Sequence, residues 1–410
     1  MAVLFVGLGV NVHYRAAVSA QLRSDFLVFH AAGRAVLAGE DPYAVRHPRG
    51  WGFFYPPTMA ALMTPFALLP AGQAAVAWYA VSVFALLWSA RRVHQLVRAA
   101  IGGPAGWVVL LAFLANFGPI VSGLQRGQIS VVLFALGVEA IWHYAAGRRR
   151  AAGVWVALGA ALKVYPLLLL LVPLVRRDGR TVLGFAAALV LLATLPPAIA
   201  MGPARAWDAT RTWTRTVLLP FAGAGAAQGP DAFESIDLLS PSNQSAYAVA
   251  GRWLCRAATT PDDPPIAVAD LPLSVARSIA ALAAVAVVVL LAAAAWRQPD
   301  TAPGARPGRS ARDLALWSLV LLAACVLPRV GWQHYFVPLS LAHSLIGAAI
   351  LRAPGGSTRT ALIAGQALAL AANWLHFASY TARAGGALLA ATLVAAVTVQ
   401  IAARVLDRNP

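Results

Sequence analysis

The chain has 410 residues, of which 60% are hydrophobic and only 11% are charged, and its mean hydropathy is +0.69. A soluble domain carries about 25% charged residues, so this composition excludes an ordinary soluble protein and predicts a polytopic membrane protein. The net charge of +17 could indicate nucleic-acid binding, but the placement of the charges along the chain argues against it.

Most of the positive charge lies in short connectors between hydrophobic runs. Seventeen arginines fall in these connectors against four acids, whereas ten of the 15 acids fall in two longer loops near 21–55 and 201–270. Cytoplasmic loops carry an excess of Lys and Arg, so we place the connectors in the cytoplasm and the two loops on the exoplasmic side. The basic charge therefore indicates topology, and no nucleic-acid partner is predicted. The connectors lie near 91–98, 148–150, 176–180, 297–312, 352–359 and 404–408.

Hydrophobic runs of about 20 residues predict membrane-spanning helices. We expect twelve of them, two of which are short, with both termini in the cytoplasm. The predicted fold is all-α, a single integral-membrane domain over residues 1–410. The spans are expected near 1–20, 72–90, 104–122, 128–146, 151–164, 166–175, 181–200, 272–296, 312–328, 335–352, 360–378 and 385–403.

One further apolar segment, residues 56–70, is bounded by prolines and is only 15 residues long. A span there would reverse the side of every later loop and would put the arginine connectors outside. We therefore expect an interfacial or re-entrant helix at this segment.

The only lysine of the chain, Lys163, lies in a hydrophobic stretch three residues before Pro166. Proline has no backbone donor and disfavours helix at the residue before it, so the chain is expected to break here. An intramembrane charge normally faces a polar cavity or an anionic partner, which predicts a site for an anion such as a lipid-linked phosphate. The alternative is a lysine that reaches the membrane interface from a helix end.

Four short motifs follow one another between residues 25 and 245. They are Asp25 with Gly39-Glu40-Asp41-Pro42-Tyr43 and Tyr55-Pro56-Pro57, then Gly127-Gln128-Ile129-Ser130, then Leu162-Lys163-Val164-Tyr165-Pro166, and finally Ser242-Asn243-Gln244-Ser245. On a profile of twelve spans, this order resembles glycosyltransferase family 87, the polyprenol-phosphate-mannose-dependent α-mannosyltransferases and their relatives, of the GT-C class. Ser130 departs from the pattern of the family, in which asparagine is expected at this position.

The resemblance implies a hexosyltransferase of the plasma membrane. It would move a hexose, most often mannose, from a polyprenyl-phosphate donor to a glycolipid or polysaccharide acceptor on the exoplasmic face, with inversion. Asp25 matches the catalytic acidic position of the family and is expected to be the base; the alternative is an N-cap for a helix starting at Phe26. Lys163 and Arg126 are expected to hold the donor phosphate. Arg126 is expected at the N-terminus of the fourth span, where free N–H groups favour anions, although it could simply anchor the span at the interface.

Further polar and aromatic residues are expected to bind substrate. Tyr43, Tyr55 and Tyr165 could stack on the sugar or the isoprenes, but an aromatic belt at the membrane interface explains them equally well. The remaining expected contacts, of which His334 could instead be structural, are Gln128, Asn243, Gln244 and His334. The histidines show no metal-ligand spacing, and no metal or cofactor is expected.

Two other functions stay open. A transporter or flippase of lipid-linked sugars would also need Lys163 and Arg126. Within the transferases, a related arabinofuranosyl or glucosyl transfer is a further alternative. Asp25 in a structured exoplasmic loop favours a transferase, because a flippase has no need of a base outside the bilayer.

Overall fold

The computed structural model describes residues 2–19, 23–101, 103, 105–222, 238–256, 266–297 and 310–408. This part of the chain is helical, and its strand-like pairing is limited to two isolated bridges, Arg46 with Gly52 and Asn243 with Trp332. The helices, in chain order, are α1 (Ala2–His13), η1 (Tyr14–Val18), α2 (Phe26–Ala38), α3 (Pro57–Ala67), α4 (Ala71–Ile101), α5 (Gly106–Ala115), α6 (Phe117–Arg126), α7 (Ser130–Ala145), α8 (Arg149–Leu162), η2 (Tyr165–Leu170), α9 (Leu171–Val175), α10 (Gly179–Met201), α11 (Pro203–Trp213), η3 (Thr214–Leu218), α12 (Leu219–Ala222), α13 (Ala246–Leu254), α14 (Leu273–Arg297), α15 (Ala311–Val326), η5 (Gln333–Phe336), α16 (Leu339–Arg352), α17 (Ser357–Ala378), α18 (Tyr380–Ala384) and α19 (Ala387–Arg408).

Six helical stretches of the described residues are long and apolar enough to cross a membrane: α4, α10, α14, η5 with α16, α17 and α19. The pair α5 and α6 is bent by 66° and would make a seventh. The remaining expected spans coincide with shorter helices, namely α1, α7, α8, η2 with α9, and α15. The helical class is thus confirmed, while the number twelve stays a prediction.

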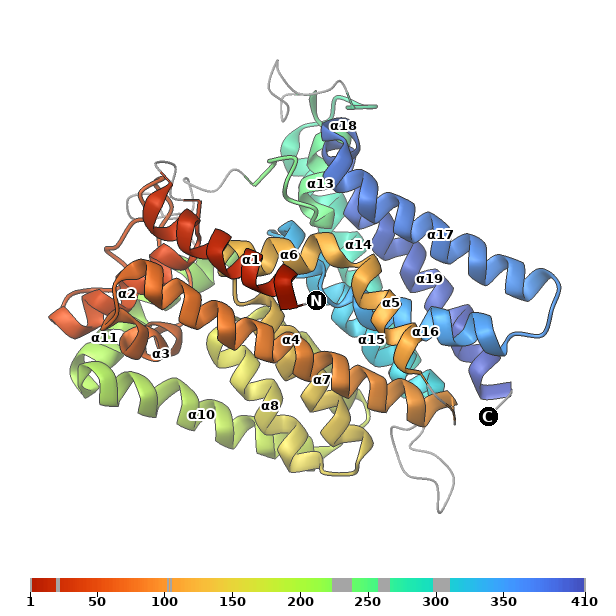
Figure 1. The fold of residues 1–410 in the computed structure, drawn as a ribbon, viewed down its shortest axis with the longest axis horizontal. Coiled ribbons are helices and arrows are strands. Elements are labelled where there is room, and N and C mark those ends of the chain that lie inside the picture. Colours follow the sequence, from red (N-terminus) through yellow and green to blue (C-terminus); the bar gives the residue numbers. More distant parts are fainter. Residues whose placement is uncertain are drawn as a thin grey trace.

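The apolar helices differ in how deeply they are buried. Only 17% of the apolar window of α10 and of α14 is buried against the rest of the protein, compared with 83% of that of Gln333–Arg352. An apolar helix with little protein around it faces lipid, so α10 and α14 line the outside whereas α16 lies in the core. In Figure 1 the C-terminal helices α16, α17 and α19 gather on one side of the molecule, and α8 and α10 lie on the other.

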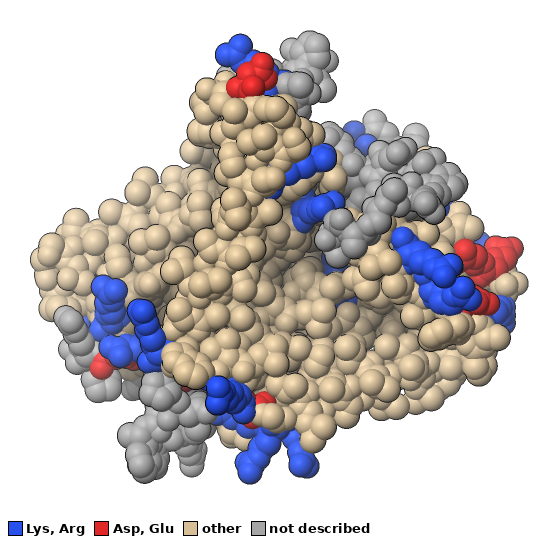
Figure 2. All heavy atoms as spheres, turned by 180° about the vertical axis from the view of Figure 1, so that it is seen from behind, with Lys and Arg blue, Asp and Glu red and all other residues tan. Residues whose placement is uncertain are grey.

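Charged side chains are grouped in a few places on the surface. On the face shown in Figure 2, most arginine clusters lie near the edges, some lie nearer the middle, and broad uncharged surface separates them. Such uncharged surface is expected of a protein that faces hydrocarbon, since charged residues are costly at membrane depth.

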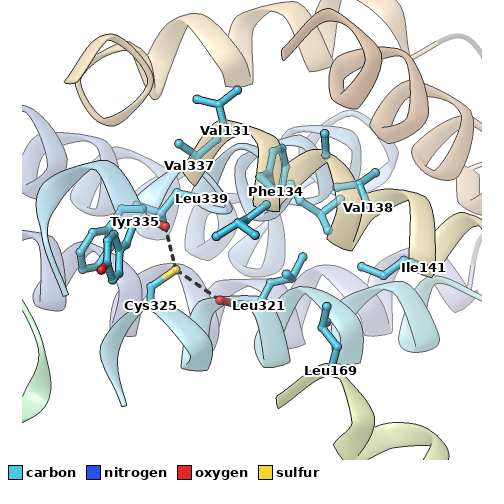
Figure 3. Packing of buried hydrophobic residues seen from close by; sticks show 14 of the residues in the cluster. Val131, Phe134, Val138, Ile141, Leu169, Leu321, Cys325, Tyr335, Val337 and Leu339 are labelled. Carbon is cyan, nitrogen blue, oxygen red and sulfur yellow. Dashed lines mark hydrogen bonds between the residues drawn. The ribbon is translucent and has the colours of Figure 1, made fainter. Parts of the chain in front are cut away.

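The core forms where α7, η2 and α15 meet. Figure 3 shows Val131, Phe134 and Val138 of α7 packed toward the helix that carries Leu321 and Cys325. The Sγ atom of buried Cys325 lies 3.3 Å from the carbonyl oxygen of Leu321 and 3.1 Å from that of Tyr335, and its single S–H group is shared between these two acceptors. The thiol thus ties α15 to η5, the segment that leads into α16.

The segment at 56–70 forms α3, a helix of 11 residues. A span needs about 20 residues, so α3 is too short to cross as a straight helix. It packs on α2 so closely that a Cβ added to Gly33 would lie 2.7 Å from the carbonyl oxygen of Met63. The hydroxyl of Thr58 donates to the carbonyl of Leu192 on α10 (2.9 Å).

The bend between α5 and α6 is held by a buried amide. Asn116 lies at the break, fully buried, and its Nδ2 lies 3.0–3.1 Å from the carbonyl oxygens of Phe336 and Val337 and the hydroxyl oxygen of Ser340, to which its two N–H groups donate. Its Oδ1 accepts from Asn373 of α17 (3.1 Å). A polar group buried without such partners costs free energy, so this network fixes the bend and directs α6 back toward α2.

Candidate active site

A cavity of about 820 Å³ lies among segments that are far apart in the sequence. Its walls come from the start of α2, the loop before α3, the turn after α6, the break after α8, η3 and the segment before and within η5. The sequence-predicted residues that line it are Asp25, Tyr55, Arg126, Gln128, Lys163, Tyr165 and His334.

Asp25 stands at the N-cap position of α2, but its side chain makes no capping hydrogen bond. Its Oδ2 instead accepts from Nε2 of Gln128 (2.9 Å) and lies 3.9 Å from a guanidinium nitrogen of Arg126. Both recorded contacts of the carboxylate reach Oδ2, so Oδ1 carries no hydrogen bond or ion pair to any described residue. The geometry is that of a carboxylate directed into the cavity, with one oxygen open to a ligand.

Arg126 and Gln128 reach the cavity because α6 ends in a left-handed turn. Gly127 has φ of +66°, and a Cβ added there would lie 2.6 Å from Cβ of Phe26. Its carbonyl accepts from the indole N–H of Trp78 (2.9 Å). The turn therefore rests directly on the first residue of α2, next to Asp25.

The position expected for Arg126 was wrong in one respect. Arg126 is the last residue of α6, and α7 begins only at Ser130. The glycine turn separates the two helices, so Arg126 does not lie at a helix N-terminus. Its contribution to anion binding would come from its guanidinium group and not from free backbone N–H groups.

Lys163 lies at the predicted break. α8 ends at Leu162, Lys163 is extended (φ −160°, ψ 138°), and η2 begins at Tyr165. Nζ of Lys163 lies 4.8 Å, 5.9 Å and 4.2 Å from the ring centroids of Tyr55, Tyr165 and Tyr335. Such distances allow cation–π attraction. The ammonium group is thus surrounded by aromatic rings in the cavity, which is not the geometry of a lysine reaching outward to the membrane surface.

His334 also lines the cavity, next to Tyr335. Its side chain is buried, and neither ring nitrogen has a hydrogen-bond partner among the described residues. Buried polar groups normally have partners, so an imidazole that borders a cavity without one is available to a ligand. The indole N–H of Trp213 is in the same situation at another point of the wall.

Of the Ser242–Ser245 motif, Ser242 lines the cavity, and the following residues support the wall that carries His334. Nδ2 of Asn243 donates to the carbonyl of Arg329 (2.9 Å), and Oδ1 of Asn243 accepts from the backbone N–H of Gly331 (2.8 Å). The backbone N–H of Gln244 donates to the carbonyl of Gly331 (2.8 Å). These bonds hold residues 329–331 directly before η5 and so position His334.

Three residues expected to bind substrate do not line the cavity. Asn243 and Gln244 are fully buried, and their amides bond to backbone groups. Tyr43 is buried too, and its hydroxyl donates to the carbonyl of Tyr55 (2.9 Å). In this structure all three hold wall segments in place and lie behind the residues that a ligand could touch.

Other residues of the wall were not among the sequence-predicted ones, above all Arg49 and Arg329. A signal for them was present, because both arginines lie outside the cytoplasmic connectors, on the side where the positive-inside rule predicts few. Trp51 and Trp332 also line the cavity. Among the described residues no three His, Cys, Asp or Glu side chains lie close enough together to hold a metal ion.

Comparison with known proteins places the chain in a class of membrane enzymes. The model of glycosyltransferase family 87 matches residues 53–327, about two thirds of the chain, so the chain belongs to this family.

Two curated relatives carry the same name, polyprenol-phosphate-mannose-dependent alpha-(1-2)-phosphatidylinositol mannoside mannosyltransferase. The one from Mycobacterium tuberculosis is 32% identical over 214 residues, which are 48% of this chain and 48% of that protein. The one from Mycolicibacterium smegmatis is 30% identical over 214 residues, 48% of this chain and 47% of that protein. The match thus spans about half the length of each relative. The crystal structure of ArnT from Cupriavidus metallidurans bound to undecaprenyl phosphate is similar at 15% identity and a TM-score of 0.37, covering 99% of this chain and 77% of that one.

Proposed function

We propose that the protein is a membrane glycosyltransferase that moves mannose from a polyprenyl-phosphate donor to a glycolipid or polysaccharide acceptor. Family membership supports the class of reaction, and the names of the two relatives support the donor. The observation that carries the proposal is the combination, in one cavity, of a carboxylate with an open oxygen and two cations, Lys163 and Arg126.

In the proposed reaction, Oδ1 of Asp25 takes the proton of the acceptor hydroxyl while the hydroxyl oxygen forms a bond to the anomeric carbon. The bond between that carbon and the phosphate oxygen breaks, and the phosphate keeps the electron pair. Lys163 and Arg126 stabilise the resulting charge. Attack opposite the leaving phosphate inverts the configuration, so a β-linked donor yields an α-glycoside.

The remaining cavity residues would orient the two substrates. His334 and Trp213 supply polar groups without protein partners, and Tyr165 stacks on Tyr335 with ring centroids 5.4 Å apart. We propose that the imidazole of His334 and the indole N–H of Trp213 bind the acceptor or the phosphate. The tyrosine pair would contact the sugar or the first isoprenes. Tyr43, Asn243 and Gln244 are assigned to positioning, since they lie behind the wall. No metal or cofactor takes part in the scheme.

We further propose that the reaction occurs on the exoplasmic face of the plasma membrane. The positive-inside rule, applied to the arginine connectors, supports this side for the first and second loops, and the cavity draws its walls from both loops and from the break at Lys163. A flippase of lipid-linked sugars is the alternative that the same cations allow. The open carboxylate oxygen favours transfer, because translocation of a lipid needs no base.

The test is transfer by the purified protein. It is incubated with mannose, glucose or arabinofuranose linked to polyprenyl phosphate, together with membrane glycolipids, and the product and its anomeric configuration are determined by mass spectrometry and NMR. An α-mannoside formed only from the mannose donor supports the proposal. Translocation of the donor across liposomes without any glycoside would instead support the flippase, and transfer of another sugar would reassign the donor.

A further inference from the structure

Four cavity side chains form a continuous series of hydrogen bonds. Nζ of Lys163 donates to the hydroxyl of Tyr55 (3.3 Å), which donates to Oε1 of Gln128 (3.2 Å). Nε2 of Gln128 donates to Oδ2 of Asp25 (2.9 Å). The series joins the cation expected at the donor phosphate to the carboxylate expected at the acceptor.

The chemistry of these groups gives the series a single direction. An ammonium group can only donate and a carboxylate can only accept. The oxygen of Tyr55 therefore accepts from Lys163, and its one proton goes onward to Gln128. With its oxygen bound in this way, the amide of Gln128 must turn its NH₂ group toward Asp25. The opposite amide orientation would set a carbonyl oxygen against the carboxylate.

The middle of the series is firmly held. Tyr55 and Gln128 are 8% and 7% exposed. The ring of Tyr55 packs edge-on against Phe29 with centroids 4.8 Å apart, and its backbone carbonyl accepts from Tyr43. In a buried environment, hydrogen bonds in a chain strengthen one another. Toward the described residues Lys163 uses one of its three N–H donors, so a phosphate could bind the other two without breaking the series.

We propose that Tyr55 is a positioning residue whose hydroxyl transmits the charge of Lys163 through Gln128 to Asp25. The series holds Oδ2 of Asp25 and leaves Oδ1 directed at the acceptor. This role replaces the stacking on substrate that the sequence suggested for Tyr55. Its catalytic consequence rests on the proposed function, whereas the series itself does not.

The experiment is a double-mutant cycle of Lys163→Met and Gln128→Met, measured once in the parent protein and once in the Tyr55→Phe background. Lys163 and Gln128 share no hydrogen bond, so coupling carried by hydrogen bonds between them passes through the hydroxyl of Tyr55. The direct electrostatic attraction between Lys163 and Asp25 does not depend on that hydroxyl. We expect a coupling of about 1–2 °C in the melting temperature of the detergent-solubilised protein, and a clear decrease of this coupling in the Tyr55→Phe background. Tyr79→Phe is the matched control, because that hydroxyl bonds to the carbonyl of Phe5 away from the cavity.

Turnover gives the second readout. Tyr55→Phe keeps the ring, so we expect kcat to fall about tenfold with the KM for the donor nearly unchanged. A coupling of undiminished size in the Tyr55→Phe background, or a loss confined to the donor KM, would overturn the proposal. If no polyprenyl-phosphate sugar is transferred at all while the thermal coupling behaves as expected, then the proposed function fails and the series stands.

Discussion

Asp25 and Gln128 lie 103 residues apart in the sequence and are joined by a hydrogen bond of 2.9 Å. The bond connects the first turn of α2 with the glycine turn that ends α6. It brings the predicted base into the same cavity as Arg126 and Lys163. Because it satisfies one oxygen of the carboxylate and leaves the other open, the predictions below can separate the base from the groups that hold it.

Replacing the base should abolish transfer without unfolding the protein. Asp25→Asn keeps the size of the side chain but removes the general base. A general base typically accelerates a reaction by about 10²- to 10⁴-fold, so kcat should fall by that factor. Expression and melting temperature should stay near those of the parent. The control is Asp208→Asn, an exposed carboxylate on α11. Transfer by Asp25→Asn at the parent rate would remove Asp25 from the mechanism.

Removing the charge of Lys163 should weaken binding of the donor. Lys163→Met keeps the aliphatic stem, so the KM for the polyprenyl-phosphate sugar should rise about tenfold or more, consistent with loss of a charged hydrogen bond. The KM for the acceptor should change much less. Lys163→Arg should restore binding only in part, since a planar guanidinium is not a compact point charge. Arg211→Met, on the exposed side of α11, is the control for a general effect of removing a positive charge. An unchanged donor KM in Lys163→Met would contradict the assignment of Lys163 to the donor phosphate.

The glycine turn offers a matched pair of substitutions. Gly127 and Gly147 both have positive φ, +66° and +76°, but a Cβ at Gly127 would clash with Phe26 whereas a Cβ at Gly147 meets nothing within 4 Å. Left-handed backbone costs a residue with a side chain about 1–2 kcal/mol. Gly147→Ala should show this strain alone, measured as a lowered melting temperature. Gly127→Ala should be less stable still and should lose transfer, because the turn carries Arg126 and Gln128. Equal effects of the two changes would mean that the contact with Phe26 is unimportant.

Accessibility of introduced cysteines tests the side of the membrane on which the cavity opens. Both native cysteines are buried, so they should contribute little background. Ala44 is exposed in the first loop, and Ala146 is partly exposed after α7. An impermeant maleimide added to intact cells should label Ala44→Cys at once, and Ala146→Cys only after permeabilisation. Labelling of both in intact cells would contradict the topology.

Features that depend on neighbouring residues in the chain could be predicted from the sequence. Hydrophobic runs predicted the helices, and Pro166 predicted the break at Lys163 that the structure contains. In contrast, the sequence did not reveal that Arg126 lies at the C-terminal end of a helix and not at the N-terminus of the next one. This position depends on the left-handed Gly127, whose need for glycine arises from contact with Phe26, about 100 residues away.

The residues of the site likewise differ in how far the sequence alone could predict their roles. Lys163 and His334 stand out in the sequence because a charged or polar side chain in an apolar stretch is conspicuous, whereas Asp25 was predicted from the resemblance to the family. The supporting role of Asn243 was hidden, because its partners at Arg329 and Gly331 are backbone groups that leave no mark in a sequence. Arg49 and Arg329 were overlooked among many arginines, although their position outside the connectors set them apart.

The single lysine also gives the protein a built-in chemical handle. With 31 arginines and one lysine, the chain carries one side-chain amine, and that amine borders the cavity. An acylating reagent or an aldehyde-bearing lipid analogue would therefore mark one interior position without any engineering of the surface. The extent of its reaction, read by mass spectrometry of the peptide around Lys163, would report on how far the cavity is occupied in native membranes.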